Sequence, residues 1–577
     1  MKRSRLIDVL QKFFPGTSRS RRRRAVTGFP QTGTVQLETR CLLSADVAVQ
    51  LIAGSLYVTG AAAGDRTLDV APDDLDPTVL NFTPGPNTTV NGSFDTLQIP
   101  LSKITKNVII NLNNGVTGNN ATVLTFDGGT LSVAGALSVS MAGKGADTLI
   151  FNNGQFKGAA TVFLGTGDDM ASLTGLKVGG GTLIDSGLGT DSVGLHSSIL
   201  GAVSITERGK ANDVRVDDSV LSSLSILEQG SQTVTSLYEL SVSGSLTVTL
   251  AAGRQGLDIN ESTVGGAVTV AAGSTPGASS FGFDRLEAKS LTVSCGNGGY
   301  AIQANQLNIQ NNVTITAGNG NTDIGLFETI KIGGLTYLSV GKGNSAIGIV
   351  GSPSPTVTAP IATLHAININ VGSGQTGVIL NNLTATSLNV SAGTGSNFFA
   401  LGGDITVPEL PGDLYAFSGT TFLGGSATFT GPVSITSLGT GNQAFIHESF
   451  FKSSFTLVDG GSQNSLFVST SQFNGPTNIV MYGTRNFVGI EVEEVMTTSS
   501  VLFELPSTSF ARGLNVTFPQ ATAVGNGGLV RLGTNWGPTV VLGQKSTIYG
   551  ASVVLSDALV GASNIKLIFS KFIDLPI

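Results

Sequence analysis

The chain repeats one pattern three times: Gly143-Lys-Gly145-Ala-Asp147, Gly165-Thr-Gly167-Asp-Asp169 and Gly187-Leu-Gly189-Thr-Asp191. The leading glycines are 22 residues apart, and a degenerate copy of the pattern follows at Gly209, with Asp213 as its last residue. The spacing continues less strictly as far as Gly483. Before the turns, apolar residues alternate with polar ones, as in Leu137-Ser-Val139-Ser-Met141. This alternation predicts short β-strands with one buried face, separated by tight turns.

A fixed period of this length indicates a solenoid, because one unit is too small to bury its own apolar face and must stack on the next. Parallel strands stacked ~4.8 Å apart pair their backbone groups between coils and bury a continuous apolar column. We therefore expect an all-β chain in which residues 108–550 form a parallel β-helix with coils of about 22 residues. A β-sandwich array is the alternative, but its hairpin turns would not produce a single long period.

The composition excludes several classes of protein. Hydrophobic residues make up 40% of the 577 residues, too many for a disordered polar chain. No run of about 18 consecutive apolar residues is present, so the sequence predicts no transmembrane helix. Three His and two Cys are too few for zinc clusters or a disulfide framework, and we expect Cys41 and Cys295 to be unpaired thiols.

Charge is distributed unevenly along the chain. Ten of the 31 basic residues lie in the first 40 positions, so residues 1–46 form a basic leader and the rest of the chain is acidic. An acidic body repels phosphate backbones, so the sequence predicts no nucleic-acid partner. A basic leader is typical of a segment that directs a chain to a transport machinery or an anionic surface.

The leader ends in Leu37-Glu38-Thr39-Arg40-Cys41-Leu42-Leu43-Ser44. This stretch resembles the LEPR-XLL motif found near the N-terminus of many large surface proteins of planctomycetes, behind a similar basic leader. The residues that agree with the motif are Leu37, Glu38, Arg40, Leu42 and Leu43, while Thr39 stands where the family usually has proline. The resemblance implies a sorting or processing signal, read by the export machinery, on a protein of the cell surface or the extracellular space.

Two further regions flank the repeats. Residues 47–107 are expected to form a β-rich capping region, in which residues 54–60 pair with the short strand at 68–70 and prolines mark a following loop. Residues 551–577 are largely apolar and are expected to fold over the last coil. An uncapped solenoid end would expose a backbone edge that pairs with other chains.

The repeated aspartates are the first candidate site. One repeat per coil would align Asp147, Asp169, Asp191 and Asp213 along the stack. Adjacent like charges near 5 Å apart repel by about 1 kcal/mol per pair in water, so a solvated face with screened charges is the first interpretation. The second is a ladder bridged by Ca²⁺, which prefers several carboxylate and carbonyl oxygens, and the sequence indicates no other cofactor.

The second candidate site is catalytic. Many parallel β-helices cleave acidic polysaccharides with a basic residue beside clustered carboxylates, and Arg215, Asp217 and Asp218 would offer this set on one coil. The histidines at 196, 365 and 447 look isolated in the sequence. The pattern at Gly372-Ser-Gly374-Gln-Thr-Gly377 fits a dinucleotide fingerprint, but no amphipathic helix follows it.

Two functions follow from these observations. The first is a non-enzymatic, exported surface solenoid that acts as a structural or adhesive element and binds glycans or other cell-envelope components through weak, repeated contacts. The second is a polysaccharide lyase or hydrolase built on the same fold. Few basic residues remain in the body for a polyanion-binding groove, which favours the first function.

Overall fold

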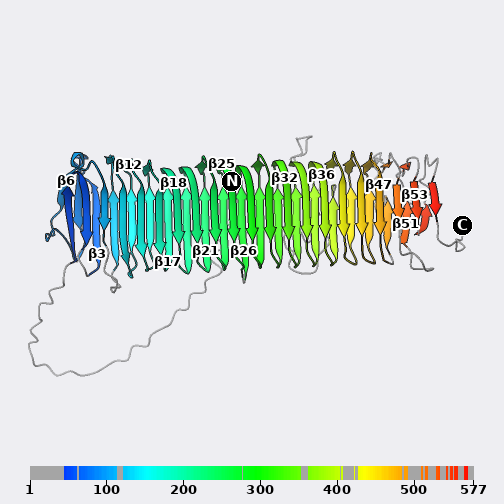
Figure 1. Cartoon of the computed structure of the whole chain (residues 1–577), viewed down its shortest axis with the longest axis horizontal. Helices are drawn as coiled ribbons and strands as arrows, with labels where there is room; N and C mark the ends of the chain where they lie inside the picture. The colour runs from blue at the N-terminus through cyan, green and yellow to red at the C-terminus, as the bar shows by residue number, and fades with distance from the viewer. Residues whose placement is uncertain are drawn as a thin grey trace, which may run out of the picture. The chain divides into compact units, whose positions relative to one another are not determined.

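The computed structural model is a stack of β-coils (Figure 1). It describes residues 45–60, 64–112, 121–275, 277–351, 362–402, 405–406, 421–422, 426–483 and 486–490, and after these a set of strands between Ser509 and Ile568. The leader and its motif, with Leu37, Glu38, Arg40, Leu42 and Leu43, lie outside the described residues, as does Cys41. No helix among the described residues is long and apolar enough to cross a membrane.

Each coil contributes a strand to each of two parallel sheets, called sheet A and sheet B here. The strands of sheet A are β7 (Val108–Asn111), β10 (Leu137–Gly143), β13 (Ala160–Gly165), β16 (Thr182–Gly187), β18 (Ile199–Glu207), β20 (Val220–Glu228), β23 (Leu246–Leu250), β25 (Thr263–Ala272), β27 (Glu287–Cys295), β30 (Val313–Ala317), β32 (Ile330–Val340), β34 (Ala362–Val371), β36 (Leu383–Ala392), β41 (Val433–Ser437), β44 (Phe455–Asp459), β47 (Thr477–Met481), β50 (Leu514–Thr517), β53 (Ser546–Tyr549) and β55 (Ile565–Ile568).

The strands of sheet B are β8 (Thr122–Asp127), β11 (Thr148–Asn152), β14 (Met170–Thr174), β17 (Thr190–His196), β19 (Ala211–Asp217), β21 (Gln232–Tyr238), β24 (Arg254–Asn260), β26 (Ala278–Asp284), β28 (Gly299–Asn305), β31 (Thr322–Phe327), β33 (Ser345–Val350), β35 (Thr376–Asn381), β37 (Asn397–Leu401), β42 (Gln443–His447), β45 (Ser465–Ser469), β48 (Phe487–Ile490), β51 (Gly528–Leu532) and β54 (Ala551–Leu555).

Short strands join sheet A where a coil turns back toward it. They are β9 (Ser132–Val133), β12 (Gln155–Phe156), β15 (Lys177–Val178), β22 (Ser241–Val242), β29 (Asn308–Ile309), β40 (Ala427–Phe429), β43 (Ser449–Phe451), β46 (Gln472–Phe473), β49 (Ser509–Phe510) and β52 (Val541–Leu542). A separate antiparallel pair is formed by β38 (Ile405–Thr406) and β39 (Thr421–Phe422).

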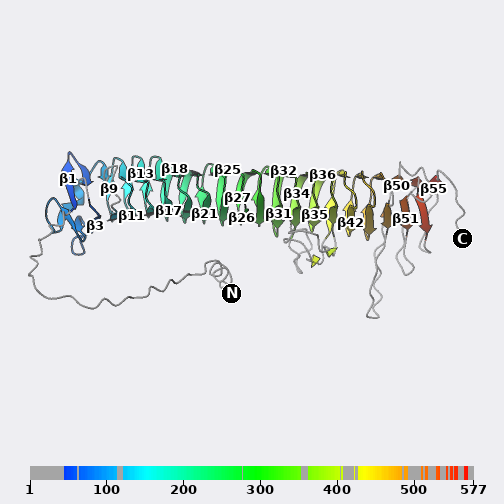
Figure 2. The ribbon, with the colours of Figure 1, turned by 90° about the horizontal axis from the view of Figure 1, so that it is seen from below.

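The register follows the sequence period. In sheet A, Ala160 of β13 pairs with Thr182 of β16, and in sheet B, Met170 of β14 pairs with Ser192 of β17. Figure 2 shows the coils following one another in chain order along the long axis. The predicted parallel β-helix with coils of about 22 residues is confirmed.

The core lies between the sheets, because the inward residues of both are Val, Ile, Leu and Phe. They form one continuous cluster from Val47 to Val516. Burying one such side chain contributes about 1.5–3 kcal/mol, and each is buried only because the coil above and the coil below cover it. Stability therefore depends on stacking rather than on any single coil.

The capping region differs from the predicted strand pair. β2 (Ser55–Gly60) pairs antiparallel with β1 (Ala45–Ile52) and parallel with β7 of the first coil. β3 (Arg66–Pro72) belongs to the other sheet, where it pairs parallel with β8 and antiparallel with β4 (Val79–Pro84). The predicted pairing of residues 54–60 with 68–70 is therefore wrong, because β2 and β3 lie in different sheets and each pairs with the first coil in its own sheet. The remaining elements of this region are β5 (Thr88–Val90), β6 (Leu97–Pro100) and a 3₁₀ turn (Leu101–Lys103).

At the C-terminal end, the coils continue past the predicted boundary at 551. β54 pairs parallel with β51, and β55 pairs parallel with β53. Residues 551–555 and 565–568 therefore belong to the solenoid ladder rather than to a separate cap, and residues 569–577 lie outside the described residues.

Candidate functional site

One buried position recurs at the same corner of each coil, at the start of each sheet B strand, and carries a polar residue. We call this row the corner column. Its members are Arg66, Thr122, Asp147, Asp169, Asp191, Asn212, Thr233, Gln255, Ser279, Tyr300, Thr322, Ser345, Thr376, Asn397, Asn442, Asn464 and Asn486.

Seven members of the corner column accept a backbone amide of the preceding coil: Asp147, Asp169, Asp191, Ser279, Asn442, Asn464 and Asn486. The amide of Thr122 donates to Asp147 Oδ1 at 2.8 Å, and the amide of Asp147 donates to Asp169 Oδ1 at 2.7 Å. The same bond joins the amide of Asn442 to Asn464 Oδ1 at 3.0 Å. A buried amide without a partner is costly, so an oxygen-bearing side chain at this position stabilises the turn of the preceding coil.

This geometry corrects the solvated-face interpretation. Asp147, Asp169 and Asp191 do align, but they are only 1–2% exposed. Asp213 is not in the row: Asp191 pairs with Asn212, and Asp213 lies beside Ser192 on the exposed side. The coil between them is 21 residues long, one residue short of the usual period, so its side-chain phase changes.

The calcium ladder gains no support. Each inward aspartate directs one carboxylate oxygen to a backbone amide. Within the described ranges, no group of three or more His, Cys, Asp or Glu side chains is placed to hold a metal ion. Since Asp213 lies outside the row, the described residues do not assemble the predicted ladder of four aspartates.

Burial shifts the titration of these groups. Burial raises the pKa of Asp147 to about 7 and that of Asp169 to about 6, against the hydrogen bonds that favour their ionised forms. Burial also raises the pKa of Asp191. Desolvation penalises the charged form of a carboxyl group, so this part of the column favours the neutral acids.

Two buried glutamates that were not predicted from the sequence face the corner from sheet A. Glu207 and Glu228 are 0% exposed and are direct register neighbours on adjacent coils. Burial raises the pKa of Glu207 to about 10 and that of Glu228 to about 7. The signal was available, because the alternation of Val203 and Ile205 directs the next odd-numbered residue, Glu207, into the core.

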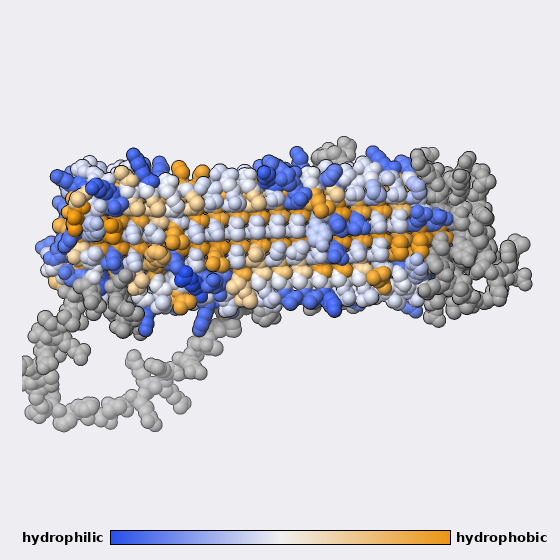
Figure 3. All heavy atoms as spheres, viewed as in Figure 1, coloured by the Kyte–Doolittle hydropathy of each residue, from blue (hydrophilic) through white to orange (hydrophobic). Residues whose placement is uncertain are grey.

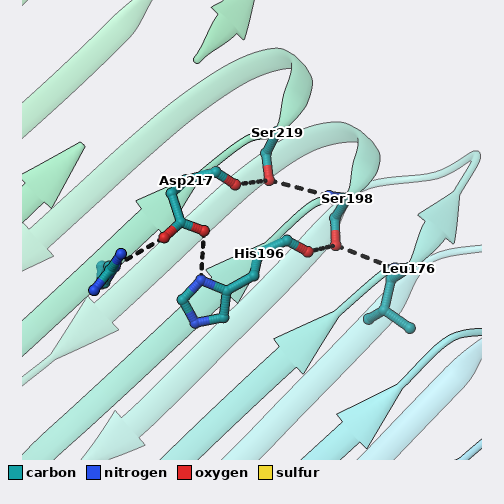
Figure 4. Close-up of polar contacts among 6 residues, drawn as sticks. Leu176, His196, Ser198, Asp217 and Ser219 are labelled. Atoms are coloured by element: carbon teal, nitrogen blue, oxygen red, sulfur yellow. Dashed lines mark hydrogen bonds and ion pairs between the residues drawn. The ribbon is translucent and has the colours of Figure 1, made fainter. Parts of the chain in front are cut away.

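The predicted catalytic set is only partly assembled, on the outer face of sheet B (Figure 4). Asp217 Oδ2 accepts a bond from Arg215 Nε at 2.8 Å, and Asp217 Oδ1 lies 2.5 Å from His196 Nδ1. His196 is therefore not isolated. Its partner is 21 residues later, directly beside it on the next coil. Asp218 instead occupies the following turn, exposed and in the left-handed region with φ 49°.

A serine ladder stabilises the turn behind this cluster (Figure 4). The amide of Leu176 donates to Ser198 Oγ, and the amide of Ser198 donates to Ser219 Oγ, both at 3.1 Å. Ser219 Oγ in turn donates to the carbonyl oxygen of Asp217 at 2.7 Å. The backbone that carries His196 and Asp217 is thus fixed from both neighbouring coils.

The geometry of this cluster limits its chemistry. Asp217 is mostly buried and orients the imidazole of His196, while Arg215 is largely exposed. The ring lies against Gly194, where a Cβ atom would come within 2.5 Å of His196 Nε2. The imidazole of His196 is held in one orientation near the guanidinium of Arg215. These two groups together suit contact with an acidic group of a ligand.

The outer face of sheet A presents a second regular feature, which we call the outer row. One residue of each coil lies in register with the next and is not buried: Ser225, Thr247, Thr269, Thr292, Thr314, Tyr337, Asn368, Asn389, Ser434, Thr456, Asn478 and Asn515. Figure 3 shows one face of the stack as pale and hydrophobic rows that run along its length. The outer row places a hydroxyl or amide group about every 4.8 Å along the stack.

The outer face of sheet B is less polar toward its C-terminal end. Phe445 stacks on Phe467 with ring centroids 5.0 Å apart, and Phe467 lies 5.4 Å from Phe487. Next to this row, Phe398 and Ile379 belong to a small buried cluster that is separate from the main core. His447 lies on the same face, and its Nδ1 is 2.6 Å from Ser469 Oγ.

The structure also shows the surroundings of the glycine-rich pattern at residues 372–377 and of Cys295. The Gly372–Gly377 pattern covers the turn after β34 and the first two residues of β35, so a strand stands where dinucleotide binding requires a helix. Cys295 is a free thiol, and burial raises its pKa to about 12.

Comparisons with known proteins identify no relative of this chain. A scan against protein-family models finds no match, and searches of curated proteins and of solved structures find no significant match. Function is therefore inferred from the geometry of the chain itself.

Proposed function

We propose that this protein is an exported, non-enzymatic solenoid that acts as a structural or adhesive element of the cell surface. The fold gives a continuous core stabilised by every coil, which suits a stiff spacer. The resemblance of residues 37–44 to a sorting motif of surface proteins supports placement outside the cell.

The outer row is the observation that carries the adhesive part of this proposal. Its hydroxyl and amide groups repeat once per coil, and neighbours contact one another, as Asn389 Nδ2 donates to Asn368 Oδ1 at 3.3 Å. A polymer with its own regular hydroxyl groups, such as a neutral glycan chain, can contact several coils at once. Weak contacts along such a row sum to a useful affinity.

A glycan-array screen of the full chain, run beside lyase and hydrolase assays, tests this function. The double variant T269R/T292R places two bulky cations in the outer row, and S236R is the matched control on the outer face of sheet B. We expect glycan binding that falls at least about tenfold in T269R/T292R and is kept in S236R. Glycan turnover, an absence of glycan binding, or equal binding by all three proteins would contradict the proposal.

The cluster of His196, Asp217 and Arg215 favours one alternative, a lyase or hydrolase acting on an acidic polysaccharide. An oriented imidazole can take a proton, and the neighbouring guanidinium can neutralise a uronate carboxylate. The activity assays above decide this alternative: turnover of a uronate polymer that is lost in H196A and R215A would establish it.

The leader is tested separately. We propose that residues 37–43 are read during export. Fusing residues 1–46 to a reporter and replacing both Leu42 and Leu43 with alanine is expected to prevent its normal sorting. Unchanged sorting of the double variant would contradict a role for the motif.

A further inference from the structure

The chemistry of the corner column changes along the stack. The coils of residues 137–238, called the aspartate coils here, place three buried aspartates in the column, Asp147, Asp169 and Asp191, and carry the two buried glutamates beside it. The coils of residues 362–402, called the neutral coils, contain no acidic residue, and their column members are Thr376 and Asn397. Both segments keep the parallel register, but their sheet B strands differ in burial: β14 and β17 alternate buried and accessible residues, whereas every residue of β35 and β37 is buried.

We propose that the aspartate coils are a pH-sensitive segment that tightens on protonation, whereas the corner column of the neutral coils does not respond to pH. The one titratable side chain of the neutral coils is the exposed His365. This pH response depends on the hydrogen-bonding capacity of the side chain in the corner column, which differs between the two segments. It would give a surface solenoid one end that stiffens in acid.

The asparagines show what the aspartates lack when they are ionised. Asn442 and Asn464 accept an amide bond from the preceding coil through Oδ1. Their Nδ2 groups also donate to turn carbonyls, Asn442 to Gly439 and Asn464 to Gly461, both at 2.8 Å. A carboxylate can only accept, whereas a protonated carboxyl group carries an O–H donor. Protonation therefore gives aspartate the donor that asparagine always has.

The glutamate pair adds to this preference for the protonated form. Glu207 and Glu228 are register neighbours in the core, and neither oxygen of Glu207 has a hydrogen-bond partner. Glu228 accepts a bond from Thr235 Oγ1. Ionising both glutamates would place two adjacent charges in a low-dielectric interior with only one hydrogen bond between them and the surrounding chain.

Like charges dominate the surroundings of these groups. In the corner column, Asp147 faces Arg66 and Asp169, Asp169 faces Asp168 and Asp191, and Asp191 faces Asp168 and Asp185. Of the two glutamates, Glu207 faces Glu228, Asp191 and Asp213, and Glu228 faces Asp213. Among these partners, Asp185 is paired with Arg208 at 2.9 Å, and Asp213 is near Arg215. Arg66 is the one buried cation among the described residues, and of these five acids it faces Asp147.

The sign of the pH dependence follows from linkage. The folded pKa values of Asp147 (about 7), Asp169 (about 6) and Glu228 (about 7) lie above those of an unfolded chain. The folded state therefore binds protons more tightly, and this contribution to the free energy of unfolding is complete below about pH 4. It is lost as the pH rises through the folded pKa values.

Native-state hydrogen exchange of the full chain tests the proposal, with EDTA present and protection corrected for the intrinsic exchange rate. Between pH 5 and pH 8, we expect the amides of residues 137–238 to lose protection at least about tenfold, while those of 362–402 change little. Equal responses in the two segments, or greater protection of the aspartate coils at pH 8, would overturn the proposal.

Two reciprocal variants sharpen the test. D147N/D169N should reduce the response of the aspartate coils, and N397D should introduce a similar response into the neutral coils. The wild-type series remains decisive if N397D fails to fold. A D147N/D169N protein with the full wild-type pH response would assign the effect to other groups and overturn the role of the column.

Discussion

At the scale of the residue, one position per coil carries the most information. In the corner column, the aspartates, Ser279 and three of the asparagines accept a turn amide from the preceding coil, whereas the side-chain oxygens of Gln255 and Thr376 have no hydrogen-bond partner among the described residues. Asp147, Asp169 and Asp191 were predictable as neighbours from their spacing. Asn212 was not, because a coil shortened by one residue changes the phase without any signal in the composition.

Replacement of a turn glycine tests how closely the coils approach. At Gly187, φ is 92° and a Cβ atom would lie 1.5 Å from the carbonyl oxygen of Gly165 on the neighbouring coil. We expect G187A to lower the free energy of unfolding by at least about 2 kcal/mol in urea titration. G181A is the control, because the nearest atom there is 3.6 Å away. Equal stability of the two variants would refute this close approach.

At the scale of the element, several strands are too short to be held by backbone pairing alone. β40, β43 and β46 contain two or three residues each, yet their phenylalanines stack inside the core. The rings of Phe451 and Phe473 are 4.5 Å apart, and those of Phe429 and Phe451 are 5.6 Å apart. Aromatic burial therefore fixes the register of these strands.

Truncating the middle ring should be costly for this reason. Phe451 is fully buried between its two neighbours, so F451A is expected to reduce the free energy of unfolding by about 3–5 kcal/mol. F163A is the matched control, because that ring lies 38% exposed on the outer face of sheet A. Chemical denaturation of both variants gives the comparison, and a similar small loss in both would contradict the stacking argument.

At the scale of the whole molecule, stability is distributed along the solenoid because each coil contacts only its neighbours. At the N-terminal end, β1, β4 and β6 add antiparallel strands beside the first coils, which covers edges that would otherwise pair with other chains. The outer row extends over many coils, so any adhesive function belongs to the stack rather than to a single coil.

Removal of divalent metal provides a test at this scale. The inward carboxylates are engaged by backbone amides, so we expect EDTA to leave the Tm of the full chain unchanged and added Ca²⁺ to have no effect on it. Differential scanning calorimetry at pH 7 is the measurement. A Tm that falls with chelator and recovers with Ca²⁺ would restore the calcium ladder.

The amino-acid sequence was sufficient for the fold class, the coil length and the apolar inward residues of the strands, because a solenoid repeats local information: each period specifies a turn and two strand phases. It was not sufficient for contacts between coils. Whether His196 meets Asp217, or Glu207 lies beside Glu228, depends on small changes in coil length that accumulate along the stack. Burial at the corner was also decided only by the tertiary structure, since Asp169 is shielded from water by residues 22 positions away on either side.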